Sequence, residues 1–255
     1  MANVQAKDLL NIRRHLAVLR NWIRDLPALV AMRDPQKRWL FRNRNLRMDA
    51  NLDINDARRR DFHKDRYELA VRVLRERRGP GAAVLDGACG TGYGSDILKR
   101  AGPARIVGVD IAADAVAYAQ QHYGSEACTF QVQDVSELAG FPDASFDAVV
   151  SFETIEHIDR PLRFLERAQA VLKPGGLLIL STPNKWGLTV DHKFDYDYAT
   201  LVDHVGRFFA IEEIYSQNSG SLELWVNRGQ PRRIVKAEGP DRESAECFIA
   251  VCRKA

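Results

Sequence analysis

Residues 84–92 read Val-Leu-Asp-Gly-Ala-Cys-Gly-Thr-Gly, an apolar stretch that runs through an acid into three closely spaced glycines. A segment with helical character follows directly, and a second apolar run, residues 106–109, ends in Asp110. A strand, a glycine-rich turn, a helix and a second strand ending in an acid are typical of a nucleoside-binding βαβ unit. The turn needs glycine because its backbone must approach the ligand and adopt positive φ angles. Asp110 is placed to accept hydrogen bonds from two ribose hydroxyls.

The rest of the chain extends this unit into a doubly wound, seven-stranded, Rossmann-like α/β sheet. Five strands are expected in the first part of the sheet, near residues 82–86, 105–109, 127–132, 146–151 and 177–182. Two closing strands are expected near 208–216 and 246–252, and helices near 94–101, 112–122 and 160–172. Another helix is expected from Asp61 to the Gly-Pro-Gly at 79–81, with an inner face formed by Tyr67, Leu69, Ala70, Val73 and Leu74. Residues 217–245 mix Gly, Pro, Asn and Arg, and we interpret them as an irregular insertion over the substrate.

The chain of 255 residues is long enough for one large α/β domain and an appendage. We place the boundary after residue 60. Residues 1–60 carry 14 Lys and Arg against 6 Asp and Glu, whereas the whole chain has a net charge of +3, so the remainder is mildly acidic. The sequence therefore predicts a basic N-terminal arm, residues 1–60, before a catalytic domain, residues 61–255.

The predicted arm contains apolar residues in alternating steps of three and four, typical of a helix with an apolar seam. These residues are Leu9, Ile12, Leu16, Leu19, Ile23, Leu26 and Val30. We expect the seam to pack on its own domain or on a second copy of the arm, which would make a homo-oligomer. The alternative is a basic amphipathic helix lying on a membrane or a nucleic acid.

Other sequence features indicate the cellular compartment. No apolar run has the length of a transmembrane span, and charges interrupt each apolar stretch at the N-terminus, so no signal peptide is predicted. The four cysteines include no C-x-x-C pair. We therefore expect a reduced, cytoplasmic protein.

The glycines distinguish between cofactors. A dinucleotide fingerprint, G-x-G-x-x-G, would need glycine where Ser95 stands. The order D-G-x-C-G-T-G instead resembles motif I of class I S-adenosylmethionine-dependent methyltransferases. Segments 130–134, 145–151 and 172–180 resemble the later motifs of that family, in the family's order. The alternatives are an NAD-binding Rossmann domain or an inactive relative.

This resemblance implies S-adenosylmethionine as the cofactor and assigns a set of residues to it. The acid of the third-strand motif, Asp134, would reach the adenine amino group. The full cofactor-binding set is Asp86, Gly87, Ala88, Gly90, Gly92, Asp110, Ile111, Asp134, Val135 and Phe152.

Residues 153–157, Glu-Thr-Ile-Glu-His, follow the predicted fourth strand. Ligands of open α/β sheets bind outside the carboxyl ends of the strands, so this segment is expected to face the transferred methyl group. If residues 153–157 form one helical turn, Glu153, Glu156 and His157 share a face. Two carboxylates and an imidazole would then form half of an octahedral metal site.

This segment, with Thr-Pro-Asn at 182–184 and Asp-His-Lys-Phe at 191–194, resembles the metal site of RNA 3′-end 2′-O-methyltransferases. The E-x-x-E-H pattern alone also resembles ubiquinone-biosynthesis O-methyltransferases. The resemblance implies Mg²⁺ or Mn²⁺ held by Glu153, Glu156, His157 and His192. The same pattern occurs in bacterial glycan and sugar methyltransferases that the chain resembles overall, many of which imply no metal. In that interpretation Glu153 lines the pocket, Glu156 caps a helix and His157 is the general base.

Taken together, the sequence predicts an O-methyltransferase whose catalytic residues are Glu153, Glu156 and His157. The expected acceptor is a small molecule or glycan, a sugar or natural product with vicinal hydroxyls. One alternative is an RNA 3′-terminal 2′-O-methyltransferase, which the near-neutral charge and the lack of an RNA-binding module disfavour. The other is a non-catalytic adaptor that binds S-adenosylmethionine and uses the arm to hold a partner.

Overall fold

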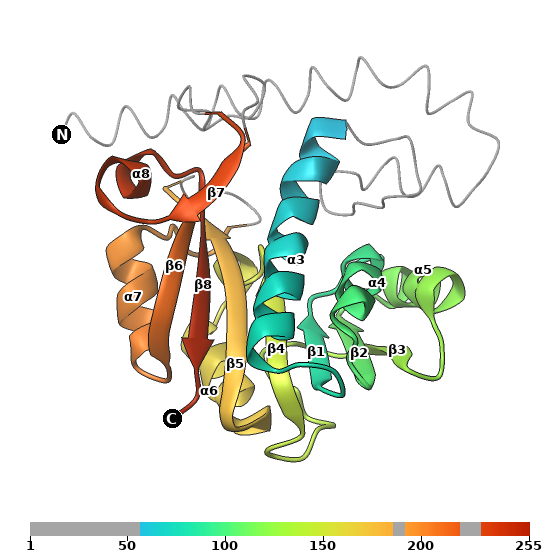
Figure 1. The fold of residues 1–255 in the computed structure, drawn as a ribbon. Helices are drawn as coiled ribbons and strands as arrows, with labels where there is room; N and C mark the ends of the chain where they lie inside the picture. The colour runs from blue at the N-terminus through green and yellow to red at the C-terminus, as the bar shows by residue number, and fades with distance from the viewer. Residues whose placement is uncertain (1–56, 186–191, 220–230) are drawn as a thin grey trace. The chain divides into compact units, whose positions relative to one another are not determined.

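The computed structural model describes residues 57–185, 192–219 and 231–255 (Figure 1). These residues belong to one compact unit that begins at residue 56. The apolar seam predicted for residues 9–30, and the oligomer proposed to use it, lie outside the described residues.

A mixed sheet of eight strands forms the centre of the described part, with the order β3-β2-β1-β4-β5-β8-β6-β7. The strands are β1 Ala83–Gly87, β2 Arg105–Asp110, β3 Cys128–Val132, β4 Phe146–Phe152, β5 Leu172–Pro183, β6 Ala210–Asn218, β7 Arg233–Lys236 and β8 Cys247–Arg253. The first five are parallel neighbours, and β8, β6 and β7 join them in antiparallel pairs. The doubly wound α/β prediction is confirmed in this architecture.

The predicted count of seven strands is wrong, because the described residues contain an eighth strand, β7. It lies inside residues 217–245, which we interpreted as an irregular insertion, and pairs with the end of β6 from Tyr215 to Asn218. The strand has four residues, too few for an alternating pattern to stand out between Arg- and Pro-containing flanks. A short helix, α8 Gly239–Ser244, occupies the same region.

Helices cover both faces of the sheet. On one face α3 Ala57–Arg77 packs against α4 Tyr93–Leu98, and α4 in turn contacts α5 Ala113–Tyr123 (Figure 1). The other face holds α6 Pro161–Val171 and α7 Tyr198–Gly206. Two short 3₁₀ helices, η1 Lys99–Ala101 and η2 Ile155–His157, complete the set. Among the described residues, none of the helices combines the length and the hydropathy that crossing a membrane requires.

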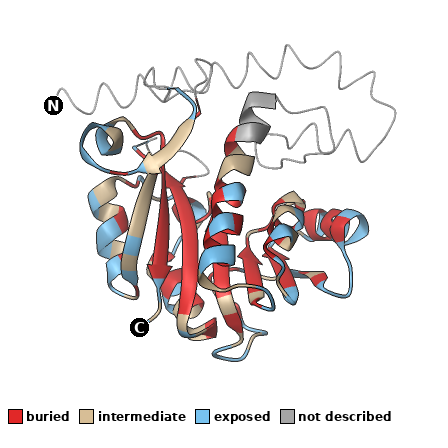
Figure 2. Ribbon diagram, viewed as in Figure 1, coloured by how far each residue is buried: buried red, intermediate tan, exposed pale blue. Residues whose placement is uncertain are grey.

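Burial follows the periodicity of each element. The central strands are buried on both faces, as Figure 2 shows in red, because helices lie above and below a parallel sheet. The α3 helix is buried along one stripe only and presents exposed residues on its outer side (Figure 2). All five residues predicted for its inner face are buried: Tyr67, Leu69, Ala70, Val73 and Leu74.

The parallel register brings the carboxyl ends of β1, β2, β4 and β5 to one edge of the sheet. Gly87 at the end of β1 pairs with Val109, next to Asp110 at the end of β2. On the other side of β1, the strand β4 ends at Phe152, which pairs with Ser181 near the end of β5. Segments from four distant parts of the sequence therefore meet at the carboxyl edge of the sheet.

Gly94 offers a test of the packing between α3 and α4. A Cβ added at Gly94 would overlap the ring of Tyr67, which is 6 % exposed and packs edge-on against Phe152. We expect Gly94→Ala to lower the free energy of unfolding by about 1–3 kcal/mol, the usual cost of overpacking. Gly206→Ala is the matched control, since nothing lies within 4 Å of a Cβ there. Equal melting temperatures for the two variants would contradict this packing.

Candidate active site

The glycine-rich loop between β1 and α4 depends on left-handed backbone conformations. Ala88, Gly90 and Gly92 have φ angles of 58°, 55° and 85°. At Gly92 a side chain is excluded twice, because an added Cβ would also lie 2.6 Å from the Cβ of Ala119. The loop is tied to β2 by a hydrogen bond of 2.9 Å from the Cys89 N–H to the Val109 carbonyl.

Asp110 joins this loop to the end of β2. One carboxylate oxygen accepts a hydrogen bond from the Gly90 N–H at 2.9 Å, and the other accepts one from the Ala112 N–H at 2.9 Å. The next residue, Ile111, is 72 % exposed, although isoleucine is normally buried.

The other predicted cofactor residues lie along the same edge. Phe152 ends β4, and Asp134 and Val135 follow β3. The Asp134 carboxylate accepts hydrogen bonds from the Ser136 N–H at 2.8 Å and its hydroxyl at 2.7 Å. Gly87 packs so closely on this segment that an added Cβ would lie 2.9 Å from the Val135 Cγ2. The structure thus gathers the ten residues of the set, and their contact with a cofactor stays a prediction.

Asp86, below the glycine loop, is a fully buried acid. Its carboxylate accepts hydrogen bonds from the Ser95 hydroxyl at 2.6 Å and from the Tyr67 hydroxyl at 3.3 Å. Burial raises the pKa of this carboxyl to about 7, and the charge of nearby Asp110 adds to the effect, while the two hydrogen bonds oppose it.

This shift predicts a pH dependence of stability. Because the folded-state pKa of Asp86 lies above its unfolded value, its contribution is fully present below about pH 4 and is lost as the pH rises through about 7. Between pH 5.5 and 8.5 we expect Asp86 to remove about 2 kcal/mol from the free energy of unfolding of the cofactor-free protein. Asp86→Asn should flatten this part of the profile in denaturant titrations. Asp96→Asn, at an exposed position in α4, is the control, and parallel profiles for all three proteins would refute the assignment.

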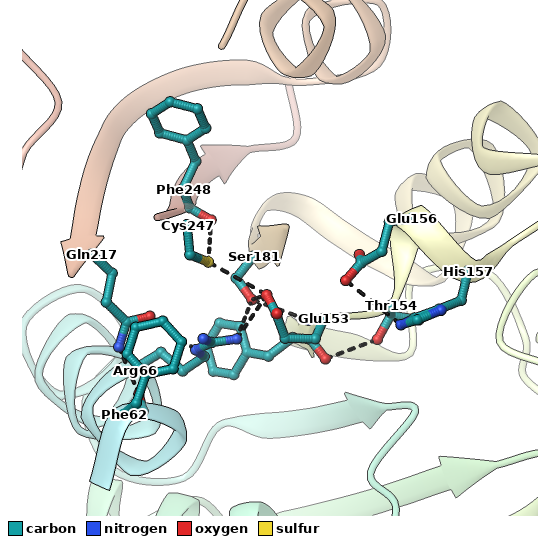
Figure 3. A network of polar contacts seen from close by, with 11 residues as sticks. Phe62, Arg66, Glu153, Thr154, Glu156, His157, Ser181, Gln217, Cys247 and Phe248 are labelled. Carbon is teal, nitrogen blue, oxygen red and sulfur yellow. Dashed lines mark hydrogen bonds and ion pairs between the residues drawn. The ribbon is translucent and has the colours of Figure 1, made fainter. Parts of the chain in front are cut away.

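The segment after β4 departs from the prediction. Only Ile155–His157 form a helical turn, and Glu153 lies before it with a φ of +51°. The expectation that residues 153–157 form one turn, with Glu153, Glu156 and His157 on one face, is therefore wrong. Glu153 turns instead toward α3, where its Oε1 lies 2.8 Å from a guanidinium nitrogen of Arg66 (Figure 3).

Three of the four predicted metal ligands do come together. The potential ligand atoms of Glu156, His157 and His192 all lie within 4.8 Å of one another, and Glu153 is outside this group. The imidazole rings of the two histidines meet edge to face, with centroids 4.8 Å apart. His192 is brought there because the N–H groups of Lys193 and Phe194 donate to the Glu156 carbonyl at 2.7 and 3.1 Å.

Glu156 is the least satisfied acid of the site. It is 1 % exposed, and neither carboxylate oxygen has a hydrogen-bond partner among the described residues. His157 Nε2 lies 3.7 Å from Oε1, on a side chain that is 37 % exposed. Burial, followed by the charge of Glu153, holds the pKa of Glu156 well above its usual range. A buried carboxylate that is so weakly compensated favours a proton of its own or a bound cation.

Sequence reasoning missed the residues around Glu153. The side chain of Glu153 is surrounded by Arg66 from α3, Ser181 from β5 and Cys247 from β8 (Figure 3). Gln217 from β6 lies against Arg66. One signal was available: Arg66 stands on the apolar inner face of a predicted helix, next to Tyr67. A charged residue in a buried stripe is rare unless it is paired.

Comparison with known proteins finds relatives of the central part of the chain. Residues 85–180 match the protein family described as a methyltransferase domain. A ubiquinone biosynthesis O-methyltransferase of Xanthomonas campestris pv. campestris is 41 % identical over 108 residues, which are 42 % of this chain and 45 % of that protein. The corresponding enzyme of Xanthomonas oryzae pv. oryzae is 39 % identical over 107 residues, 41 % of this chain and 44 % of its own. The match thus spans less than half the length of these curated relatives.

Solved structures agree in fold. An S-adenosylmethionine-dependent methyltransferase from Mesorhizobium loti has a TM-score of 0.56 at 16 % identity, covering 76 % of this chain and all of that one. The Burkholderia thailandensis 1,6-didemethyltoxoflavin-N1-methyltransferase, solved with S-adenosylhomocysteine, has a TM-score of 0.54 at 22 % identity, covering 77 % and 82 %.

Residues 85–180 thus resemble a methyltransferase domain in sequence, and the described part of the chain has the fold of solved S-adenosylmethionine-dependent methyltransferases. These matches support the S-adenosylmethionine-dependent methyltransferase predicted from motif I, and the fold implies S-adenosylmethionine as the cofactor.

Proposed function

We propose that this protein transfers the methyl group of S-adenosylmethionine to a hydroxyl oxygen of an acceptor with vicinal hydroxyls, a sugar, glycan or natural product. The observation that carries the proposal is the cluster of Glu156, His157 and His192 at the sheet edge that also bears the glycine-rich loop. The relatives named as ubiquinone biosynthesis O-methyltransferases support an oxygen acceptor.

In this proposal the cofactor lies along the carboxyl edge of β1, β2 and β3. Asp110 binds the ribose hydroxyls, and Asp134 takes the adenine amino group. The exposed side chain of Ile111 and the segment at Val135 supply apolar walls. Asp86, Ala88 and the loop glycines hold the methionine portion, with Phe152 beside the reacting sulfur.

Asp110 tests this placement. Asp110→Ala removes a carboxylate that would bind two ribose hydroxyls and that also holds the loop through Gly90. Such charge-assisted hydrogen bonds are worth about 1.5–3 kcal/mol, so the dissociation constant for S-adenosylmethionine should rise roughly tenfold to a hundredfold. Asp143→Ala, at a side chain that is 76 % exposed, is the control. If calorimetry finds unchanged affinity for the Asp110 variant, the ribose does not bind at Asp110.

The chemistry requires one proton acceptor. A bond forms between the acceptor oxygen and the methyl carbon, the bond from that carbon to sulfur breaks, and the hydroxyl proton must leave. If no ion is bound, we assign this proton to the imidazole of His157, which is part-exposed and next to the buried Glu156. The protein otherwise contributes by positioning, since the sulfonium itself supplies the electrophile.

The residues of the cluster also fit a divalent cation. Two imidazoles and a buried carboxylate without hydrogen-bond partners form a donor set that suits Mn²⁺ better than Mg²⁺. When bound there, such an ion would lower the pKa of a coordinated acceptor hydroxyl. The proposed ligands are Glu156, His157 and His192, whereas Glu153 is bound to Arg66 and borders the set.

A second candidate acceptor is the 3′-terminal ribose of an RNA, which also offers vicinal hydroxyls. The observation that favours it is the position of His192, from the Asp-His-Lys-Phe segment at 191–194, beside Glu156 and His157.

The test is a panel of acceptors followed by release of S-adenosylhomocysteine: 3,4-dihydroxybenzoate, a methyl mannoside and an RNA oligonucleotide with a free 3′ terminus. We expect turnover of a vicinal diol that stops in excess chelator and returns with Mn²⁺ or Mg²⁺. Full activity in chelator would remove the ion and leave His157 as the base. No turnover of any diol, with normal cofactor binding, would contradict O-methylation and favour an adaptor.

Glu156→Gln probes the same cluster at constant shape. It should reduce turnover at least about a hundredfold and leave the affinity for S-adenosylmethionine within about twofold, because the cofactor is held by the loop and Asp110. Glu166→Gln, on the exposed side of α6, should change neither quantity. Normal turnover of the Glu156 variant would place the chemistry outside the cluster.

A further inference from the structure

Arg66 is a fully buried cation held in a network that spans four elements (Figure 3). Its Nη1 lies 2.8 Å from Glu153 Oε1 and donates to the Ser181 hydroxyl at 3.1 Å. Its Nε donates to the side-chain oxygen of Gln217 at 3.1 Å. The guanidinium also stacks on Phe62, one turn earlier in α3, at 4.7 Å from the ring centroid.

Gln217 fixes Arg66 from the other side. While its oxygen accepts from Arg66, its amide nitrogen donates to the Phe62 carbonyl at 2.6 Å. Both ends of this buried side chain are therefore bound to α3. The direction of the guanidinium is set by β6 as well as by its own helix.

The network converges on Glu153. Besides Arg66, the Ser181 hydroxyl lies 3.1 Å and the Cys247 thiol 3.4 Å from the same Oε1. The Glu153 N–H lies 3.0 Å from the Ser181 hydroxyl oxygen. These contacts hold a non-glycine residue at a φ of +51°, a conformation that L-residues rarely adopt without such restraint. Only two residues separate Glu153 from Glu156.

The neighbouring residue of α3 holds the cofactor side. Tyr67 donates to Asp86, below the glycine loop, and packs edge-on against Phe152 at 4.8 Å between ring centroids. Two consecutive residues of one helix thus contact the end of β1, which leads into the glycine loop, and the end of β4 with the segment that follows it.

We propose that Arg66 is a positioning residue that sets the left-handed turn at Glu153 and thereby the direction in which Glu156 and His157 face the acceptor. The proposal deepens the function proposed above, since it concerns the same loop. A purely stabilising role is a poor explanation for Arg66, because a buried ion pair is often equalled or exceeded in stability by apolar residues of similar volume. The pair is explained by the loop geometry that it imposes.

The experiment compares Arg66→Met, Glu153→Gln, the double variant and Arg66→Lys in the full chain. Arg72→Met, at an exposed position of the same helix, is the matched control. Three quantities are measured without any acceptor: melting temperature, affinity for S-adenosylmethionine, and hydrogen–deuterium exchange of peptides covering residues 152–160. The kcat and KM are added for whichever acceptor of the panel is turned over.

The double variant separates positioning from stability. Arg66→Met alone leaves Glu153 without its cation and should lower the melting temperature, whereas the double variant should recover most of it. Exchange of residues 152–160 should stay at least about tenfold faster than in the wild type in both. Affinity for S-adenosylmethionine should remain within about threefold, and kcat should fall roughly tenfold to a hundredfold because the loop is misplaced. Arg66→Lys should restore part of the protection.

Recovery of both stability and loop protection in the double variant would overturn the proposal and leave the pair a structural one. The same holds if Arg66→Met exchanges like Arg72→Met. If the single variant does not fold, the double variant and Arg66→Lys still decide. The exchange and melting measurements need no acceptor. If no acceptor of the panel is methylated, the result counts against the proposed O-methylation, and the role of Arg66 can still be tested.

Discussion

The parallel pairing of β2, β1, β4 and β5 is the constraint on which the site depends. Hydrogen-bonded parallel strands share a direction, so their carboxyl ends share an edge. That edge receives the glycine loop after β1, Asp110 after β2 and the Glu153–His157 segment after β4. A ligand lying there contacts segments that are up to seventy residues apart in the chain. No single one of these loops could form the site alone.

The same edge collects acids whose side chains are buried. Asp86, Asp110 and Glu156 are all buried, and Arg66 is the only Arg or Lys in the buried part of the described chain. Its guanidinium is bound to Glu153, so the other three acids depend on hydrogen bonds, protons or ligands. Burial is the main cause of the raised pKa values of Asp86 and Glu156, and the charge of a neighbouring acid adds to it in each case. The excess of buried acids also matches a cofactor with positive charges, since S-adenosylmethionine carries a sulfonium and an amine.

The sequence predicts the fold well because the strong signals are local. Apolar runs ending in Asp86 and Asp110, and the glycines between them, specify strand, turn and helix without reference to distant residues. What escaped prediction depends on tertiary contacts. The strand β7 is too short to carry a pattern and forms through pairing with β6. The conformation of Glu153 depends on Arg66, 87 positions earlier, and a spacing rule for one helical turn contains no information about that contact.

The outcome at residues 153–157 shows why a motif is less informative than its geometry. In E-x-x-E-H the two glutamates look equivalent, and their helical spacing suggests that both bind the same metal ion. The fold separates them: Glu153 bonds to Arg66, Ser181 and Cys247, and Glu156 is buried beside two imidazoles without a hydrogen-bond partner. The Glu153 carboxylate is thereby held in the contact network, and the Glu156 carboxylate can bind a proton or a cation. The difference arises from α3, an element that the motif does not include. In this chain an arginine from a helix that precedes the first strand faces the first glutamate and separates it from Glu156, His157 and His192.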